Sequence, residues 1–188
     1  KGEGPRDLYQ LSIELGAAMV VLAGKATDHD AAVAMLEENV KNGKALQKFI
    51  EMVEAQGGNG DQIRKPELLP AAKNIIDVKA EEAGYITTID AEAVGIAALM
   101  MGAGRETKES DIDFSVGIVL NKKVGEKVEK GDILAQMHMN DMSKLEECTK
   151  KIHDAYIFTS KKPEMRPLVF GKVTKDGIFR TPIYISEE

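Results

Sequence analysis

Three histidines and one cysteine are the most versatile chemical side chains in the sequence. His29, His138 and His153 stand far apart, and no two have the i, i+4 spacing that brings metal-binding histidines together on one helix face. Cys148 stands at helical spacing from apolar neighbours, which favours a core thiol over a nucleophile. The sequence therefore predicts no metal site and no thiol chemistry in this chain.

Carboxylate pairs are frequent, and one pair stands at the start of an expected strand. Asp111 and Asp113 are two residues apart, so an extended backbone points both side chains to the same face. Such a pair can hold a divalent ion, but a third ligand is missing from the pattern, and we expect a solvated strand edge. No serine stands in the glycine-flanked turn that activates a nucleophile; the serines considered are Ser12, Ser115, Ser143 and Ser160.

Two Gly-x-Gly pairs are candidates for anion binding. Gly2 and Gly4 precede an expected helix, whose N-terminus attracts anions, whereas Gly102 and Gly104 follow one. Neither pair completes G-x-G-x-x-G or the P-loop pattern, so we expect turn and cap glycines. Arg105, directly after the second pair, is a candidate for contact with an anion or for a salt bridge.

The most distinctive string is Val124–Leu134, which reads V-G-x-x-V-x-x-G-D-x-L. It is similar to half of a lipoyl- or biotinyl-carrier barrel, in which the glycines turn the chain and the apolar residues pack the sandwich. A carrier needs an exposed lysine on the hairpin that follows. The corresponding stretch, Met137–Asp141, has none, and the next lysine is Lys144. We expect the packing unit without the carrier chemistry.

The elements that carry these residues change in character along the chain. Before residue 60, apolar residues recur at helical spacing in three segments. Asp28 is placed to cap the second helix, Asn42-Gly43 separates it from the third, and Gln56–Gly60 reads as a flexible turn. Helices with one apolar face must bury that face against another element, so we expect a small helical bundle or the outer layer of a sheet. The stripe of the first helix consists of Leu8, Leu11, Leu15, Met19 and Leu22.

Beyond a proline-bounded linker at 66–70 the pattern becomes mixed. Asp90 is placed to cap a nearly all-apolar helix, Ala91–Met101, which we expect to be buried. The S-x-x-E pattern of residues 143–146 predicts a capping box for a helix that runs through His153. Strands are expected over 74–79, 85–89, 114–120, 133–139, 156–159, 168–173 and 178–185.

Composition excludes several classes. Of 188 residues, 43% are hydrophobic and 30% charged, which is typical of globular proteins and excludes a disordered chain. The net charge of −6 argues against a nucleic-acid partner, and a single cysteine excludes an internal disulfide. No apolar run approaches the roughly 20 residues that span a bilayer, and no signal-peptide pattern is visible, which predicts a cytoplasmic protein without a membrane partner.

Taken in order, the local motifs resemble one enzyme family. Residues 1 to about 176 are similar to the C-terminal part of pyrimidine-nucleoside phosphorylases, close to thymidine phosphorylase. The sequence opens without methionine, and we expect it to be a piece of a longer protein. The motifs that carry the resemblance are Lys1–Leu8 (KGEGPRDL), Asn42–Phe49 (NGKALQKF), Gln56–Gly58, Ala83–Tyr85, Gly102–Lys108, Asp113–Gly117 and Val124–Asp132.

The resemblance implies an α+β fold. Residues 1–65 are expected to be the helical end of the large α/β domain, and 66–80 a linker with the first strand. Residues 81–176 are expected to form the C-terminal α+β domain, with a barrel-like, mostly antiparallel sheet and one buried helix. Residues 177–188 remain an unassigned tail.

The resemblance also implies a function. Such enzymes are homodimers that cleave pyrimidine nucleosides with inorganic phosphate, giving the free base and (deoxy)ribose 1-phosphate, with a monovalent cation such as potassium near the phosphate. The family's catalytic, substrate-binding and cation-binding motifs precede the matched region, so this chain is expected to carry none of them, to hold no cofactor or metal, and to be inactive alone. Its expected role is structural and cleft-shaping, with Arg105 as the candidate near the closure interface.

Two other interpretations stay open from the sequence. One is a non-catalytic binding or assembly module with a degenerate carrier barrel. The other is a related nucleotide phosphorylase or a phosphoribosyltransferase-like enzyme, which shares the fold and differs in substrate.

Overall fold

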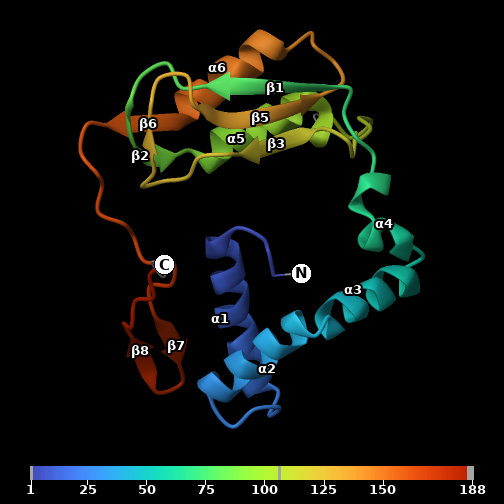
Figure 1. The fold of residues 1–188 in the computed structure, drawn as a ribbon, viewed down its shortest axis with the longest axis vertical. Helices are drawn as coiled ribbons and strands as arrows, with labels where there is room; N and C mark the ends of the chain where they lie inside the picture. The colour runs from blue at the N-terminus through green and yellow to red at the C-terminus, as the bar shows by residue number, and fades with distance from the viewer. Residues whose placement is uncertain (1, 106, 186–188) are drawn as a thin grey trace. The chain divides into compact units, whose positions relative to one another are not determined.

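The computed structural model describes residues 2–105 and 107–185, and these divide into two compact units. Unit 1 combines the described residues up to Pro66 with those from Arg166 onward, and unit 2 is Glu67–Met165. Figure 1 shows helices at the N-terminal end of the chain, strands with two long helices in its middle, and a small hairpin near its C-terminus. The domain limits given above from the sequence remain predictions. Lys1, the first residue of the KGEGPRDL motif, lies outside the described residues, as does residue 106 within the Gly102–Lys108 motif.

Four helices make up the first part of unit 1. Asp28 caps the second as expected, because its carboxylate accepts a hydrogen bond of 2.9 Å from the Ala31 amide. The flexible turn expected up to Gly60 is shorter than predicted, since Asn59 caps a further short helix by accepting from the Asp61 amide at 2.9 Å. The helices are α1 (Arg6–Leu22), α2 (His29–Lys41), α3 (Lys44–Ala55) and α4 (Gly60–Arg64).

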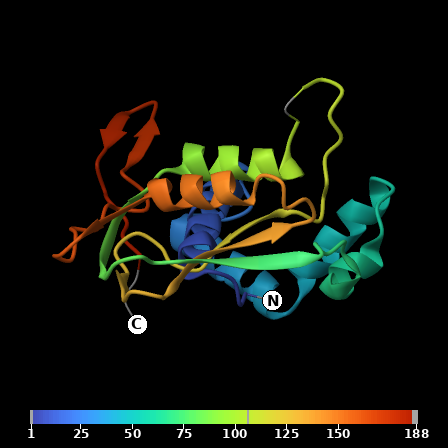
Figure 2. The same cartoon turned by 90° about the horizontal axis from the view of Figure 1, so that it is seen from above.

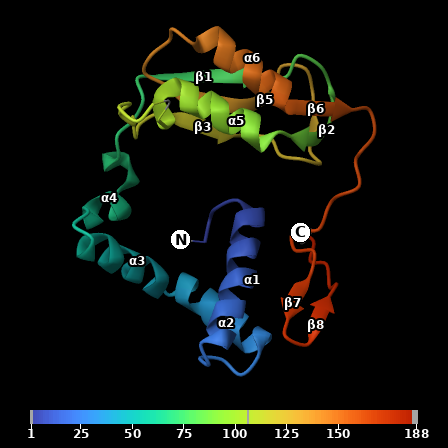
Figure 3. The ribbon, with the colours of Figure 1, turned by 180° about the vertical axis from the view of Figure 1, so that it is seen from behind.

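The face with which α1 packs on α2 is not its leucine stripe. The two helices cross (Figure 3), and the buried residues are Ala17 of α1 and Ala32 of α2. A Cβ atom at Gly16 would lie 2.9 Å from a methyl carbon of Leu36, so glycine allows the close approach. The stripe faces away from this contact, with Leu22 87% exposed.

Unit 2 contains two antiparallel three-stranded sheets and two long helices. The first sheet has the order β1-β5-β3 and the second the order β4-β2-β6. Figure 2 shows α5 and α6 side by side over one face of the strands. The elements are β1 (Asn74–Lys79), β2 (Gly84–Ile89), α5 (Ala91–Ala98), β3 (Gly117–Leu120), β4 (Lys127–Val128), β5 (Ile133–Met139), α6 (Leu145–Ala155) and β6 (Tyr156–Thr159).

The core of unit 2 lies between these sheets and helices. Ala135, Met137 and Met139 of β5 lie on one side of the strand and are buried in this core, because successive side chains of a strand face opposite sides. The adjacent Leu134 is buried as well. The register pairs Ile76 with Met137 and Val78 with Ala135, so both strands contribute apolar side chains to the same face. The largest fully buried side chains are Ile86, Leu134, Met137, Met139, Ile152, Val78, Val128 and Cys148.

The α+β class is confirmed, with two corrections. No sheet formed by the described residues closes into a barrel. The helix expected to be buried is buried on one face only: Ala97 is inaccessible, whereas Ile96 is 39% exposed. Alanine and glycine make up much of the outer face, and leaving such small side chains in water costs little free energy because they carry little apolar surface. After Ala98 the chain continues through a wider helical turn, Leu99–Ala103.

Two local predictions fail for hydrogen-bonding reasons. The strand expected from Phe114 begins at Gly117, because the Asp113 side chain accepts from the Ser115 amide at 2.9 Å and turns the chain. Phe114 is 83% exposed as a result. The capping box is also wrong: Lys144 is the N-cap residue of α6, and the Ser143 amide instead donates to the Asp141 carboxylate at 2.9 Å.

The C-terminal segment forms a hairpin that is shorter in strand content than expected. β7 (Lys172–Thr174) pairs with β8 (Gly177–Phe179), and a single bridge joins Val169 to Ile183. The strands expected over 168–173 and 178–185 are therefore only partly formed. Among the described residues, no helix is both long and apolar enough to cross a membrane.

Candidate functional site

A hydrogen-bonded node around Asp113 lies where three strands of the first sheet begin or end. The Asp113 carboxylate accepts from the Ser115 hydroxyl and the Asn140 side-chain amide, each at 2.6 Å. The Asn140 side-chain oxygen in turn accepts from the Lys73 amide at 2.8 Å. The node thereby ties the chain before β1 and the chain after β5 to the segment that leads into β3.

The same node closes the segment that carries Arg105. The Asp113 amide donates to the Gly102 carbonyl at 2.9 Å, so the two ends of residues 102–113 meet. Gly102 has φ +100°, a backbone conformation that favours glycine, and this confirms the expected helix-ending glycine. Arg105 is exposed on this segment.

Electrostatics at the node favour an ionised carboxylate. The Ser115 hydroxyl, and then the Ser115 amide and Asn140, donate hydrogen bonds to it and hold the pKa of Asp113 below its usual value of 3.8. A carboxylate satisfied in this way is a structural acceptor. The expected solvated edge is therefore more ordered than the Asp-x-Asp pattern indicates.

The histidines and the cysteine occupy separate places. His29 lies on the surface, with Nε2 2.9 Å from the Glu14 carboxylate, while His138 belongs to β5 and His153 to α6. Cys148 is fully buried in α6, and burial is the largest cause that raises the pKa of its thiol. Within residues 2–105 and 107–185, no three His, Cys, Asp or Glu side chains are grouped so as to hold a metal ion.

The carrier-like string packs only in part as expected, because Val124 is 38% exposed. Gly125 and Gly131 have φ of +91° and +95°, and they turn the chain on either side of β4. Val128 and Leu134 are fully buried in the core. Lys144 stands at the start of α6.

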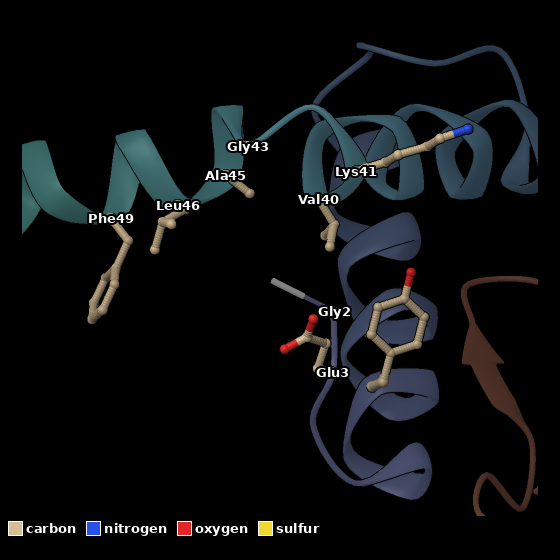
Figure 4. Close-up of a pocket in the computed structure, with 9 residues that line it drawn as sticks. Gly2, Glu3, Val40, Lys41, Gly43, Ala45, Leu46 and Phe49 are labelled. Carbon is tan, nitrogen blue, oxygen red and sulfur yellow. The ribbon is translucent and has the colours of Figure 1, made fainter. Parts of the chain in front are cut away.

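A cavity of about 520 Å³ lies in unit 1, beside the junction of α2 and α3. Figure 4 shows Val40, Ala45, Leu46 and Phe49 around it, with Glu3 on the opposite side and Lys41 extending away. The described residues that line this cavity are largely apolar.

Asn140 is a member of the node that no sequence pattern singles out. Asp113-x-Ser115 is a pattern typical of side-chain turns, and it was available as a signal. Nothing in the sequence indicates that the Asn140 side chain, directly after β5, would donate to Ser115, 25 residues earlier in the chain.

Comparison with known proteins defines the class. Residues 85–159 match the model of the family described as the pyrimidine nucleoside phosphorylase C-terminal domain. That region runs from the second residue of β2 through β6, and it includes Asp113, Ser115, Asn140 and Arg105.

Individual relatives extend the similarity beyond that domain. The chain is 50% identical over 154 residues to a pyrimidine-nucleoside phosphorylase of Bacillus subtilis (strain 168), which covers 82% of this chain and 35% of the relative. It is 50% identical over 154 residues to one from a strain of Staphylococcus epidermidis, with 82% of this chain and 34% of the relative covered. It is 49% identical over 140 residues to one from Staphylococcus aureus (strain USA300), with 74% of this chain and 32% of the relative covered.

These matches confirm the resemblance inferred from the order of motifs. The chain is similar to pyrimidine-nucleoside phosphorylases, and its residues 85–159 match the model of their C-terminal domain. It spans about a third of the length of these relatives.

Proposed function

We propose that this chain is the C-terminal part of an enzyme that cleaves pyrimidine nucleosides with inorganic phosphate, releasing the base and (deoxy)ribose 1-phosphate. The observation that carries this proposal is the 50% identity over 154 residues to pyrimidine-nucleoside phosphorylases. Identity at that level over most of the chain favours a shared reaction over the alternative of a non-catalytic assembly module.

The chemistry proposed is direct displacement at C1′ of the sugar. Phosphate attacks as the bond to the base breaks, and an oxocarbenium-like transition state is stabilised by positioning and charge. We propose that phosphate and a monovalent cation such as potassium are bound by parts of the enzyme other than this chain. The chain itself is proposed to be inactive alone, cytoplasmic, and part of a homodimer in the complete enzyme.

The role proposed for unit 2 is to support one wall of the substrate cleft. Support comes from its closed core and from the node that fixes both ends of the Arg105 segment. Such a segment presents exposed side chains from a rigid base, which is how binding residues are commonly held.

Phosphorolysis assays test the function. Thymidine and uridine are offered to the full-length enzyme and to the 188-residue chain, with and without inorganic phosphate, and release of free base is measured. We expect phosphate-dependent turnover only by the full-length enzyme. Absence of turnover there contradicts the proposed reaction, and turnover by the chain alone contradicts its proposed inactivity.

Arg105 is tested separately in the full-length enzyme. We expect Arg105→Ala to lower kcat/KM, Arg105→Lys to restore part of it, and thermal unfolding to stay unchanged because the side chain is exposed. Lys130→Ala, another exposed cation of unit 2, is the matched control and should leave kcat/KM unchanged. An equal kcat/KM for Arg105→Ala and the unaltered enzyme would contradict the proposed place of Arg105 at the cleft.

A further inference from the structure

The C-terminal segment Arg166–Ile185 belongs to unit 1, although the whole of unit 2 separates it in sequence from the N-terminal helices. The chain therefore passes between the units twice, near Pro66 and near Met165. We propose that this segment is a clasp: it docks on the helices of unit 1 and forms a second, non-covalent connection between the two ends of the chain. The proposal does not depend on the enzymatic function.

The clasp is a β-hairpin held by backbone hydrogen bonds. The Leu168 amide donates to the Ile183 carbonyl at 2.7 Å, and the Ile183 amide donates to the Val169 carbonyl at 2.9 Å. Toward the tip, β7 and β8 pair in antiparallel register, and the Thr174 hydroxyl accepts from the Asp176 amide at 3.1 Å in the turn. Backbone hydrogen bonds thus run from the base of the hairpin to its tip.

Gly171 allows the two arms to approach. A Cβ atom at this position would lie 2.5 Å from the Phe179 carbonyl oxygen and 3.2 Å from the Arg180 Cα. Both obstacles are backbone atoms of the opposite arm, so a larger residue at 171 must push the arms apart. This makes Gly171 a position at which the clasp can be opened without touching the helices.

The hairpin needs support from the rest of unit 1. A two-stranded hairpin alone is at best marginally stable in water. The tip side chains Val173 and Ile178 are largely exposed, so the two arms bury little apolar surface against each other. A direct hydrogen bond to the helices comes from α1, where the Gln10 side-chain amide donates to the Tyr184 carbonyl at 2.9 Å. That bond joins residues 174 positions apart and attaches the end of the clasp to α1.

A nicked chain tests the clasp. A protease recognition sequence is inserted between Pro70 and Ala71, in an exposed linker, and the folded chain is cleaved there. After the cut, fragment 1–70 has no covalent link to fragment 71–188, and the clasp lies on the second fragment. We expect the two fragments to co-elute on gel filtration under native conditions and to separate in denaturant.

Variants assign the co-elution to the clasp. We expect Gly171→Ala, and a chain ending at Met165, to lose co-elution after cleavage while circular dichroism shows that the helices persist. Gly4→Ala is the matched control in unit 1, since a Cβ at that position meets nothing within 4 Å, and it should retain co-elution. Separation of the unaltered nicked chain, or co-elution that survives both clasp variants, would overturn the proposal.

Discussion

Unit 2 and the helices of unit 1 use apolar residues in opposite ways. In unit 2, side chains from both sheets and from α5 and α6 meet in one cluster, and the largest of them are inaccessible to water. In α1 and α2 the fully buried residues are small, Ala17 and Ala32, while large side chains of α1 remain exposed. Unit 2 closes its own core, whereas α1 presents an apolar stripe that the described part of this chain leaves uncovered.

The difference shows what amphipathic periodicity establishes. The spacing of Leu8, Leu15 and Leu22 correctly identifies a helix with one apolar face, but it does not identify the surface that face covers. The contact with α2 instead uses Gly16 and Ala17, whose small side chains let the helix axes approach. A core closed by its own side chains is thus a property of unit 2.

The largest effect is expected from a cavity in unit 2. Leu134→Ala removes a fully buried side chain of β5 and should lower the free energy of unfolding by about 2 to 5 kcal/mol. Urea titration followed by circular dichroism measures the change. Val119→Ala on the outer face of β3 is the matched control, because that side chain is half exposed, and it should cost far less. Equal costs at the two positions would mean that the core of unit 2 is not closed.

The sequence predicted this core better than it predicted the turns around it. The predicted limits of β1, β2, β5 and β6 lie within a residue of the observed ones. The failures at Phe114 and Ser143 have one cause: an aspartate side chain, Asp113 or Asp141, takes the nearby amide. Local competition of that kind depends on backbone geometry, which apolar periodicity does not encode.

The candidate site shows the same limit. Asp113 and the glycine that ends the helix before it could be chosen from sequence, since Asx turns and helix-ending glycines have local patterns. Asn140 could not, because its part in the node depends on the pairing of β3 with β5, a contact between distant residues.

An intermediate effect is expected where β6 joins this core. The Tyr156 hydroxyl donates to the Leu134 carbonyl at 3.1 Å, and Tyr156→Phe should cost about 1 kcal/mol. Burial raises the pKa of Tyr156 from 10.0 to about 12, so the folded state favours the neutral phenol. The stability that comes from this preference for the neutral phenol is fully present below pH 10, and it is lost as the pH rises from 10 toward 12.

Urea titrations at pH 9 and pH 11 separate these contributions. The unaltered chain should lose more stability between the two pH values than Tyr156→Phe does, because the variant has no phenol to ionise at this position. An identical loss in both would show that the phenol is as accessible to water in the folded state as in the unfolded one.

The smallest effect on folding is expected in unit 1. Leu15→Ala shortens a side chain that is 56% exposed on α1, and it should change the free energy of unfolding by no more than about 0.5 kcal/mol. The same face should contribute more to self-association than to folding stability, since contiguous apolar patches favour association between molecules. Leu15→Lys with Met19→Lys should therefore leave thermal unfolding nearly unchanged while lowering the self-association measured by sedimentation velocity. If the double variant instead unfolds at a much lower temperature, the stripe is packed within the chain, and unit 1 closes a core as unit 2 does.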